Sequence, residues 1–241
     1  MAVDHHYPNA PITEAVIDIR VELPPTVALA DIERLDKKLP DYPKKNRRIE
    51  LTLMVEPSVS RQEQRLNGYV FRSMDGKQIV QMRMDGFTFS RLPPYDRWET
   101  FSVEAKRLWT IYRCGVEPLK ITRLAVRYIN RIDMPQPVDD FGKYLNAIPQ
   151  SSVDFFKNVT GFFLQLQIPQ NDIKSMLLFN EAIAPPPTEK VLSVLLDFDL
   201  SRTDNVPQDE REIWRVFEAF RSRKNELFEA CITDASRSLF Q

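Results

Sequence analysis

The chain has 241 residues, of which 33 are lysine or arginine and 34 are aspartate or glutamate, so its net charge is −1. This balance gives no support to a function that depends on neutralising phosphate groups, and the 43% hydrophobic content is that of an ordinary globular protein. The sequence has no apolar run long enough for a membrane helix and too few cysteines for a disulfide framework. We therefore expect a cytoplasmic protein without a membrane segment.

The first half of the chain predicts strands and two helices. Residues 12–23 alternate apolar and polar side chains, which is the period of a half-buried strand. Aromatic and aliphatic residues recur every three or four positions from Trp98 to Tyr112, which predicts a helix with one buried stripe. The expected helices cover residues 27–39 and 98–114, and further strands cover residues 48–56 and 68–73.

Two Asp-Gly pairs lie between these elements. Asp75-Gly76 is a two-residue hairpin signal. Asp85-Gly86 would predict a second hairpin, but the equivalent segment of the second half, residues 190–202, has no turn residue in its middle. We therefore expect one long strand over residues 77–91, bent by a bulge at Gly86.

The second half repeats this order of elements. We expect a helix over about residues 208–230, whose buried stripe includes Ile213, Phe217 and Phe220. The other expected elements are strands over residues 120–132, 160–168, 173–182 and 190–201, and a helix over residues 138–147.

The sequence resembles itself at an interval of about 110 residues. Residues 11–24 recur in outline as residues 120–132, and Phe89-Ser90-Arg91 recurs as Leu200-Ser201-Arg202. This predicts a single pseudo-symmetric domain over residues 1–241, with repeat one at about 10–118, repeat two at about 119–231 and a C-terminal tail at 232–241. The expected fold class is α+β, in which tandem duplicated β-α-β-β-β-α units form one curved antiparallel sheet with the helices on one face.

The first strands of the two repeats differ in charge. Alignment places each acidic residue of one copy on an arginine of the other. If the strands pair antiparallel, opposite charges can meet across them and fix the register. An alternative is that some of these groups line a functional groove. The expected pairs are Asp18 with Arg127, Glu14 with Arg131, and Glu22 with Arg123.

Other candidate sites are weaker. Tyr128, Asn130, Asp197 and Asp199 could bind a small ligand near the groove between the repeats, whereas His5-His6 is expected to be part of a tail. No nucleotide-binding glycine loop or metal-ligand spacing is present, so we expect no cofactor and no metal site. The candidate contact for nucleic acid is a basic cluster, and only weak binding is expected from it: Lys37, Lys38, Lys44, Lys45, Arg47 and Arg48.

Three motifs resemble a family of sporadically distributed prokaryotic proteins of similar length. They are Tyr7-x-Asn9-Ala10-Pro11-Ile12-x-Glu14-Ala15, Arg127-Tyr128-Ile129-Asn130-Arg131-Ile132 and Leu196-Asp197-Phe198-Asp199. The family is uncharacterised, so the resemblance implies no activity; its distribution is that of accessory or defence genes. In topology the expected fold is similar to the TATA-binding protein and to effector-binding domains of multidrug regulators.

These observations predict a non-enzymatic binding or interaction protein, a monomer or a homodimer. Its partner would be a protein or a small ligand. Strong duplex binding through the sheet is not expected, because acidic residues stand beside the arginines. The alternative is a small-ligand-binding regulator or an enzyme that uses the groove between the two repeats.

Overall fold

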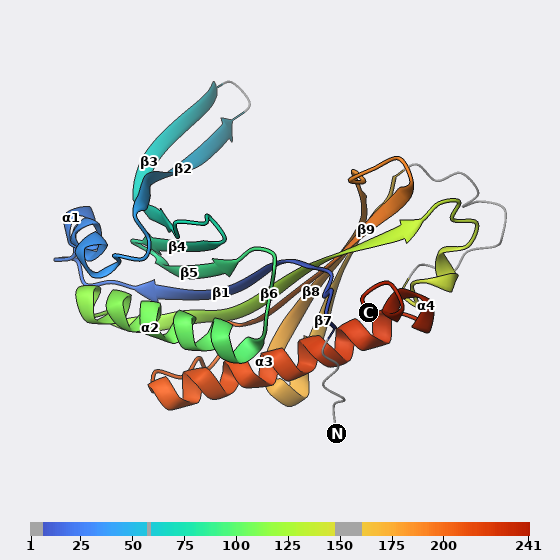
Figure 1. Cartoon of the computed structure of the whole chain (residues 1–241). Helices are drawn as coiled ribbons and strands as arrows, with labels where there is room; N and C mark the ends of the chain where they lie inside the picture. The colour runs from blue at the N-terminus through green and yellow to red at the C-terminus, as the bar shows by residue number, and fades with distance from the viewer. Residues whose placement is uncertain (1–6, 57–58, 148–160) are drawn as a thin grey trace.

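A computed structural model describes residues 7–56, 59–147 and 161–241. Nine strands form a single antiparallel sheet in the order β2-β3-β4-β5-β1-β6-β9-β8-β7 (Figure 1). The protein is therefore of the α+β class with one large antiparallel sheet, as the sequence predicts. His5-His6 lies outside the described residues.

Most strands lie within a few residues of their predicted positions, but the strand expected over residues 68–73 begins at Val59. β1 and β6, the first strands of the two halves, are neighbours at the middle of the sheet. Figure 1 shows the β2–β3 hairpin rising from the sheet on the side opposite the two long helices. The strands are β1 (Ile12–Glu22), β2 (Lys44–Glu56), β3 (Val59–Arg72), β4 (Gln78–Arg83), β5 (Gly86–Arg91), β6 (Lys120–Pro135), β7 (Phe163–Gln170), β8 (Ser175–Ala184) and β9 (Val191–Arg202).

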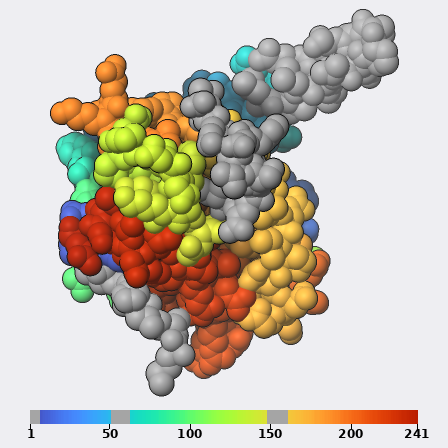
Figure 2. Space-filling view, turned by 90° about the vertical axis from the view of Figure 1, so that its right-hand side faces the viewer, coloured from blue at the N-terminus to red at the C-terminus, as the bar shows by residue number. Residues whose placement is uncertain are grey.

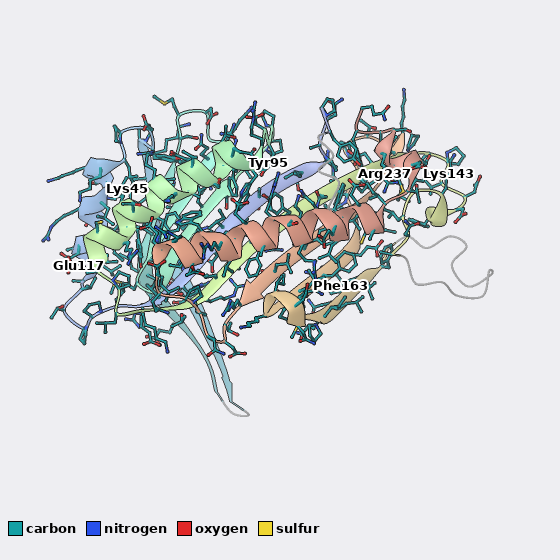
Figure 3. The ribbon with its side chains drawn as sticks, turned by 90° about the horizontal axis from the view of Figure 1, so that it is seen from below. Lys45, Tyr95, Glu117, Lys143, Phe163 and Arg237 are labelled. Atoms are coloured by element: carbon teal, nitrogen blue, oxygen red, sulfur yellow. The ribbon has the colours of Figure 1, made fainter. Side chains whose placement is uncertain are left out.

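Two long helices, α2 (Trp98–Val116) and α3 (Glu210–Cys231), cover one face of the sheet (Figures 1 and 3). The Asp209 side chain caps the start of α3 by accepting a hydrogen bond from the Glu212 N–H. α2 ends at Glu117, which adopts a left-handed conformation with φ of 43°. The short helical segments are α1 (Leu29–Glu33), η1 (Arg34–Lys38), η2 (Phe141–Lys143), η3 (Asn171–Ile173) and α4 (Asp234–Arg237).

The core lies between the sheet and these helices. Ala15, Ile17 and Ile19 alternate along β1 on the helix side and are fully buried, as the period of two predicts. They pack in one hydrophobic cluster with residues of the helix stripes, including Leu108 and Phe217. The opposite face carries the polar members of the alternation.

The single long strand expected over residues 77–91 is wrong. Residues 78–83 and 86–91 are separate strands, β4 and β5, that pair as a hairpin in which Arg83 lies opposite Gly86. A Cβ atom at Gly86 would lie 2.3 Å from the Ile19 carbonyl oxygen, so the close approach of β1 requires glycine there. The glycine therefore belongs to a turn against β1, and the comparison with residues 190–202 was misleading because those residues form one strand.

The helix expected over residues 138–147 is also wrong. Only the three-residue turn η2 forms, where the Asp140 side chain accepts a hydrogen bond from the Gly142 N–H and so favours a turn over a helix. Leu145 then forms an isolated bridge with Ile232.

The segment expected to be a C-terminal tail is packed against the domain. It contains α4, and Phe240 is buried with only 4% of its surface exposed. The Asn9 N–H donates to the Phe240 carbonyl at 3.0 Å, and the Tyr7 ring meets the Phe240 ring edge-on. The beginning and the end of the described chain therefore lie side by side.

Candidate functional site

The sheet face opposite α2 and α3, called here the charged face, carries a row of ion pairs between side chains of four strands. Arg83 of β4 donates to Asp18 of β1 at 2.9 Å, and Arg123 of β6 donates to the other Asp18 oxygen at 3.0 Å. Arg123 also contacts Asp199 of β9 at 3.2 Å. The acidic and basic side chains alternate along the row, so they neutralise most of each other's charge.

Arg127 and Arg131 extend the charged face along β6. Arg127 makes a two-bond contact with Asp197 of β9, at 2.8 and 2.7 Å, and Asn180 of β8 donates to the same carboxylate. This contact raises the pKa of Arg127. Arg131 pairs with Asp133 of its own strand at 3.1 Å.

The predicted register is wrong, although the two strands do pair. Asp18 lies opposite Ala125, and Arg127 lies opposite Val16, so the strands are offset by two residues from the expected pairing. Asp18 reaches Arg123 along a diagonal, which a long arginine side chain permits. The expected pairing of Asp18 with Arg127 is replaced by the Arg127–Asp197 contact to β9.

The two ends of β1 also depart from the expected pairing. Glu22 lies opposite Lys120, not Arg123, and Glu14 lies opposite Ile129. Arg131 accordingly turns to Asp133 within β6. The prediction matched charges across one pair of strands, whereas each central strand has neighbours on both sides.

The acids of the charged face respond differently to burial. Burial alone would raise the pKa of Asp18, but Arg83, the Thr88 hydroxyl and Arg20 outweigh it, so its pKa lies below the ordinary value. Burial also raises the pKa of Asp199, and there Arg123 and Arg127 offset it only in part. Asp18 is thus held as an anion by its partners.

The residues of the basic cluster predicted from the sequence contact different partners in different places. Lys45 pairs with Asp36 at 2.8 Å and with Glu33 at 3.2 Å, and its ammonium lies 4.7 Å from the centroid of the Tyr69 ring. Arg48 instead donates to Gln81 at 3.0 Å. The cluster therefore does not form one uncompensated basic surface.

The other candidate site, called here the helix pocket, lies between the start of α2 and the second half of α3. Its volume is about 420 Å³. Figure 3 shows Tyr95 beside the start of α2, at the margin of this pocket. The residues that define its chemistry are Tyr7, Tyr95, Trp98, Tyr128, Asn130 and Lys224.

Lys224 is the unusual member of the helix pocket. It belongs to the buried stripe of α3, between Phe220 and Phe228, and only 9% of its surface is exposed. Its ammonium lies 4.2 Å from the centroid of the Tyr128 ring, which is within the range of a cation–π contact. A lysine within an otherwise apolar stripe, at the wall of a pocket, is a candidate for contact with a ligand.

The tyrosines of the pocket are held in their neutral form. The hydroxyls of Tyr95 and Tyr128 lie 2.9 Å apart and share a hydrogen bond. Burial raises the pKa of both far above the ordinary value. At the opposite wall the Tyr7 hydroxyl donates to Glu229, and burial together with this carboxylate raises the pKa of Tyr7 to about 12.

The start of α2 adds donors to the pocket. Arg97 occupies the N-cap position and makes no side-chain hydrogen bond to the first turn. The first N–H groups of a helix have no partner within the helix, and they carry the positive end of its dipole. Arg97 and Trp98 line the pocket together with Asp96 and Glu99, and Asp96 pairs with Arg97 at 3.4 Å, so part of the positive charge at this end of α2 is already matched.

The ligand residues predicted from the sequence fall on opposite faces of the sheet. Tyr128 and Asn130 line the helix pocket, where Asn130 also donates to the Leu196 carbonyl. Asp197 and Asp199 lie on the charged face, among the arginines. The sequence reasoning did not identify Lys224, although a lysine within the apolar stripe of α3 was the signal that could have done so.

Glu181 of β8 was also not identified. It is fully buried on the helix side, and within the described chain neither carboxylate oxygen has a hydrogen-bond partner. Its cross-strand neighbours are Leu164 and Leu196. Burial raises the pKa of Glu181 from 4.5 to about 7, and it also raises the pKa of the nearby Cys231 thiol to about 12.

Across residues 7–56, 59–147 and 161–241, no helix is long and apolar enough to cross a membrane. In the same part of the chain, no three histidine, cysteine or acidic side chains are grouped to hold a metal ion. No protein-family model matches the sequence, and no curated protein matches it significantly.

Proposed function

We propose that the protein is a non-enzymatic binding protein whose small ligand occupies the helix pocket. The observation that carries this proposal is the Lys224 ammonium stacked on Tyr128 in the wall of a pocket between the two long helices. Pockets that join apolar walls to a few convergent polar groups are typical of small-molecule sites. The two cysteines are unpaired, which suits a reducing compartment such as the cytoplasm.

The lining favours an organic anion with a planar ring. Lys224 and the start of α2 supply positive charge for a carboxylate, whereas Arg97 is paired with Asp96 at 3.4 Å. Trp98 and Tyr95 supply flat apolar walls on which a ring can stack. Each of the three acids of the pocket lies near an arginine: Glu229 is 2.9 Å from Arg237, Glu99 is 3.8 Å from Arg221 and Asp96 is 3.4 Å from Arg97.

Benzoate and indole-3-acetate should raise the melting temperature, and benzoate should also change the tryptophan fluorescence, whereas their neutral amides should do neither. The reason is that only the acids present a carboxylate to Lys224 and the start of α2. Thermal unfolding and fluorescence titration measure both effects. Binding free energy scales as roughly 1.4 kcal/mol per tenfold in affinity, so loss of one charge-assisted contact is expected to weaken binding about tenfold or more.

The variant Lys224→Gln removes the charge from the pocket and should abolish the difference between acid and amide. Lys190→Gln, at an exposed position outside the pocket, is the matched control and should bind as the wild type does. An equal response to acids and amides, or an unchanged response in Lys224→Gln, would contradict the proposal.

A second candidate function is the binding of a protein partner on the charged face. It is favoured by the half-exposed arginines there, since Arg20 and Arg131 are each 38% exposed and Arg127 is 45% exposed. Their carboxylate neighbours make the face mixed in charge, which suits a protein surface better than a polyanion.

Duplex DNA should not bind this face with submicromolar affinity. The arginines that could contact phosphates are already paired with Asp18, Asp197 and Asp199, and the net charge of −1 supplies no long-range attraction. Fluorescence anisotropy with labelled duplex at several salt concentrations measures this. Tight, steeply salt-dependent binding that is lost on substitution of Arg127 or Arg131 would show the expectation to be wrong.

The proposal includes an origin of the sheet by duplication. Two features support it: β1 and β6 pair at the centre, and one long helix follows each half. From the centre outwards the order is β5, β4, β3, β2 on one side and β9, β8, β7 on the other, so the first half has one more strand than the second. The saddle of the TATA-binding protein and the effector-binding domain remain the folds to which we compare it. The groove between the repeats would then contain the helix pocket.

A further inference from the structure

β7 forms one edge of the sheet, and its sequence FLQLQIPQ contains no charged residue. Its apolar side chains are unusually open to solvent: Phe163 is 68% exposed, Leu166 is 41% exposed and Ile168 is 38% exposed. Natural edge strands are commonly protected against further pairing by charged side chains or by proline; β7 has no charge, and its one proline, Pro169, stands near its end and leaves residues 163–168 unprotected. The opposite edge strand, β2, has this protection, because it begins Lys-Lys-Asn-Arg-Arg.

The outer edge of β7 also presents backbone groups suited to pairing. The Ile183 N–H donates to the Phe162 carbonyl, so the even-numbered residues direct their backbone groups towards β8. The odd-numbered residues, among them Gln165 and Gln167, therefore direct theirs outwards. Pro169, which has no N–H, is also odd-numbered, so its presence breaks no bond to β8. Within the described residues no strand pairs with this edge.

We propose that β7 pairs antiparallel with β7 of a second copy of the chain, about a twofold axis at Leu166. Figure 2 shows the β7–β8 segment (yellow-orange) at the molecular surface beside α3, and Phe163 is labelled in Figure 3. Residues opposite one another in a continuous sheet share a face. The register at Leu166 places Leu164 opposite Ile168 of the partner subunit and Gln165 opposite Gln167 of the partner subunit.

This register is self-complementary on both faces. On the helix side, Leu164, Leu166 and Ile168 meet only apolar residues. On the other side the glutamine amides meet, and Gln165 and Gln167 can exchange both backbone hydrogen bonds because their N–H and C=O groups point outwards. No like charges are opposed, whereas pairing of two β2 edges would bring basic side chains together. The interface is independent of the helix pocket.

The wild-type chain should therefore sediment as a dimer, with twice the monomer mass of 28.2 kDa. Leu166→Lys places two ammonium groups opposite each other at the axis and should raise the dimer dissociation constant roughly tenfold or more. Val103→Lys makes the same kind of change at a 69% exposed position on α2 and should leave the dimer intact. A monomeric wild type, or a dimer that Leu166→Lys does not weaken, would overturn the proposal.

Gln165→Pro is a second test that spares the fold. It removes an outward N–H and leaves the backbone hydrogen bonds to β8 in place, while the side-chain bond from Gln165 to Asn180 at 2.8 Å is lost. The expected result is a monomer with unchanged circular dichroism. A Gln165→Pro protein that remains dimeric would place the interface elsewhere and so refute the pairing.

Disulfide cross-linking tests the register. The even-numbered residues direct their backbone N–H and C=O groups towards β8. Leu166 and its copy therefore form a non-hydrogen-bonded pair with Cα atoms about 4.5 Å apart, within the range of a disulfide. In a Cys114→Ser, Cys231→Ser background, Leu166→Cys should therefore give a covalent dimer on mild oxidation. Ile168→Cys should not, because its copy lies two residues beyond the axis on each strand. Equal cross-linking of both variants, or of neither, would count against this register.

Discussion

Replacing Asp18 with asparagine should lower the free energy of unfolding by about 2 kcal/mol, because the buried Arg83 then keeps only one of its two carboxylate partners, Asp85. The Asp18 side chain is only 11% exposed, and Arg83 beside it is 3% exposed. Asp18 accepts hydrogen bonds from Arg83, Thr88 and Arg123, and no water replaces them easily at this depth. Urea denaturation at neutral pH measures the loss.

The matched control is Glu22→Gln on the same strand. Glu22 is exposed, and such a surface change is expected to cost less than about 0.5 kcal/mol. Adding Arg83→Met to Asp18→Asn should recover part of the stability, because it removes a buried cation that has lost one of its two carboxylate partners. If Asp18→Asn costs no more than Glu22→Gln, the ion pairs of the charged face are not important for stability.

The same carboxylate sets a pH dependence. The partners of Asp18 hold its folded-state pKa below the ordinary value of 3.8. Its contribution is therefore complete above that value and is lost as the pH falls through the folded-state pKa. The difference in stability between the wild type and Asp18→Asn should accordingly shrink in acid.

The second large effect is expected at Glu181, where glutamine should stabilise the protein at pH 8. Burial raises the folded-state pKa of Glu181 to about 7, against 4.5 in the unfolded chain. Between these values the folded state binds a proton that the unfolded state does not, so wild-type stability falls as the pH rises. Each pKa unit corresponds to about 1.4 kcal/mol, which gives a full effect of up to about 3 kcal/mol above pH 7.

Urea denaturation at pH 4 and pH 8 separates this effect from any change in packing. The stability gain of Glu181→Gln over the wild type should be about 2–3 kcal/mol larger at pH 8 than at pH 4. Glu189→Gln, at an exposed position between β8 and β9, should show no such difference. If the change in stability caused by Glu181→Gln is the same at both pH values, the folded state does not raise the pKa of Glu181.

The regular elements could be predicted because their patterns are local. The alternation of Ala15, Ile17 and Ile19 gave the buried face of β1, and the stripes of α2 and α3 gave the helix side. The sequence could not decide between a hairpin turn and a bulge at Gly86. Glycine is required there because the Ile19 carbonyl approaches from another strand. The sequence around Gly86 does not predict a close approach by another strand.

The sites were predicted less completely for a related reason. Tyr128 and Asn130 were identified, but their grouping with Asp197 and Asp199 ignored the fact that a sheet separates its two faces. The charge pattern of the two first strands correctly predicted that Arg123 and Arg127 share one face of the sheet, yet their acidic partners come largely from β9. The registers of three or more strands together decide which ion pairs form on the charged face. The register of a single pair of strands does not decide them.

The central position of β1 has a consequence for synthesis of the chain. β1 lies between β5 and β6, and its second neighbour begins only at Lys120. While the ribosome is still making the residues between, Ile17 and Ile19 belong to a strand with one open edge. Folding of the first half alone therefore leaves a nascent sheet that is exposed to wrong pairing until β6 emerges, which makes early chaperone contact or slow completion of the sheet the expected course in the cell.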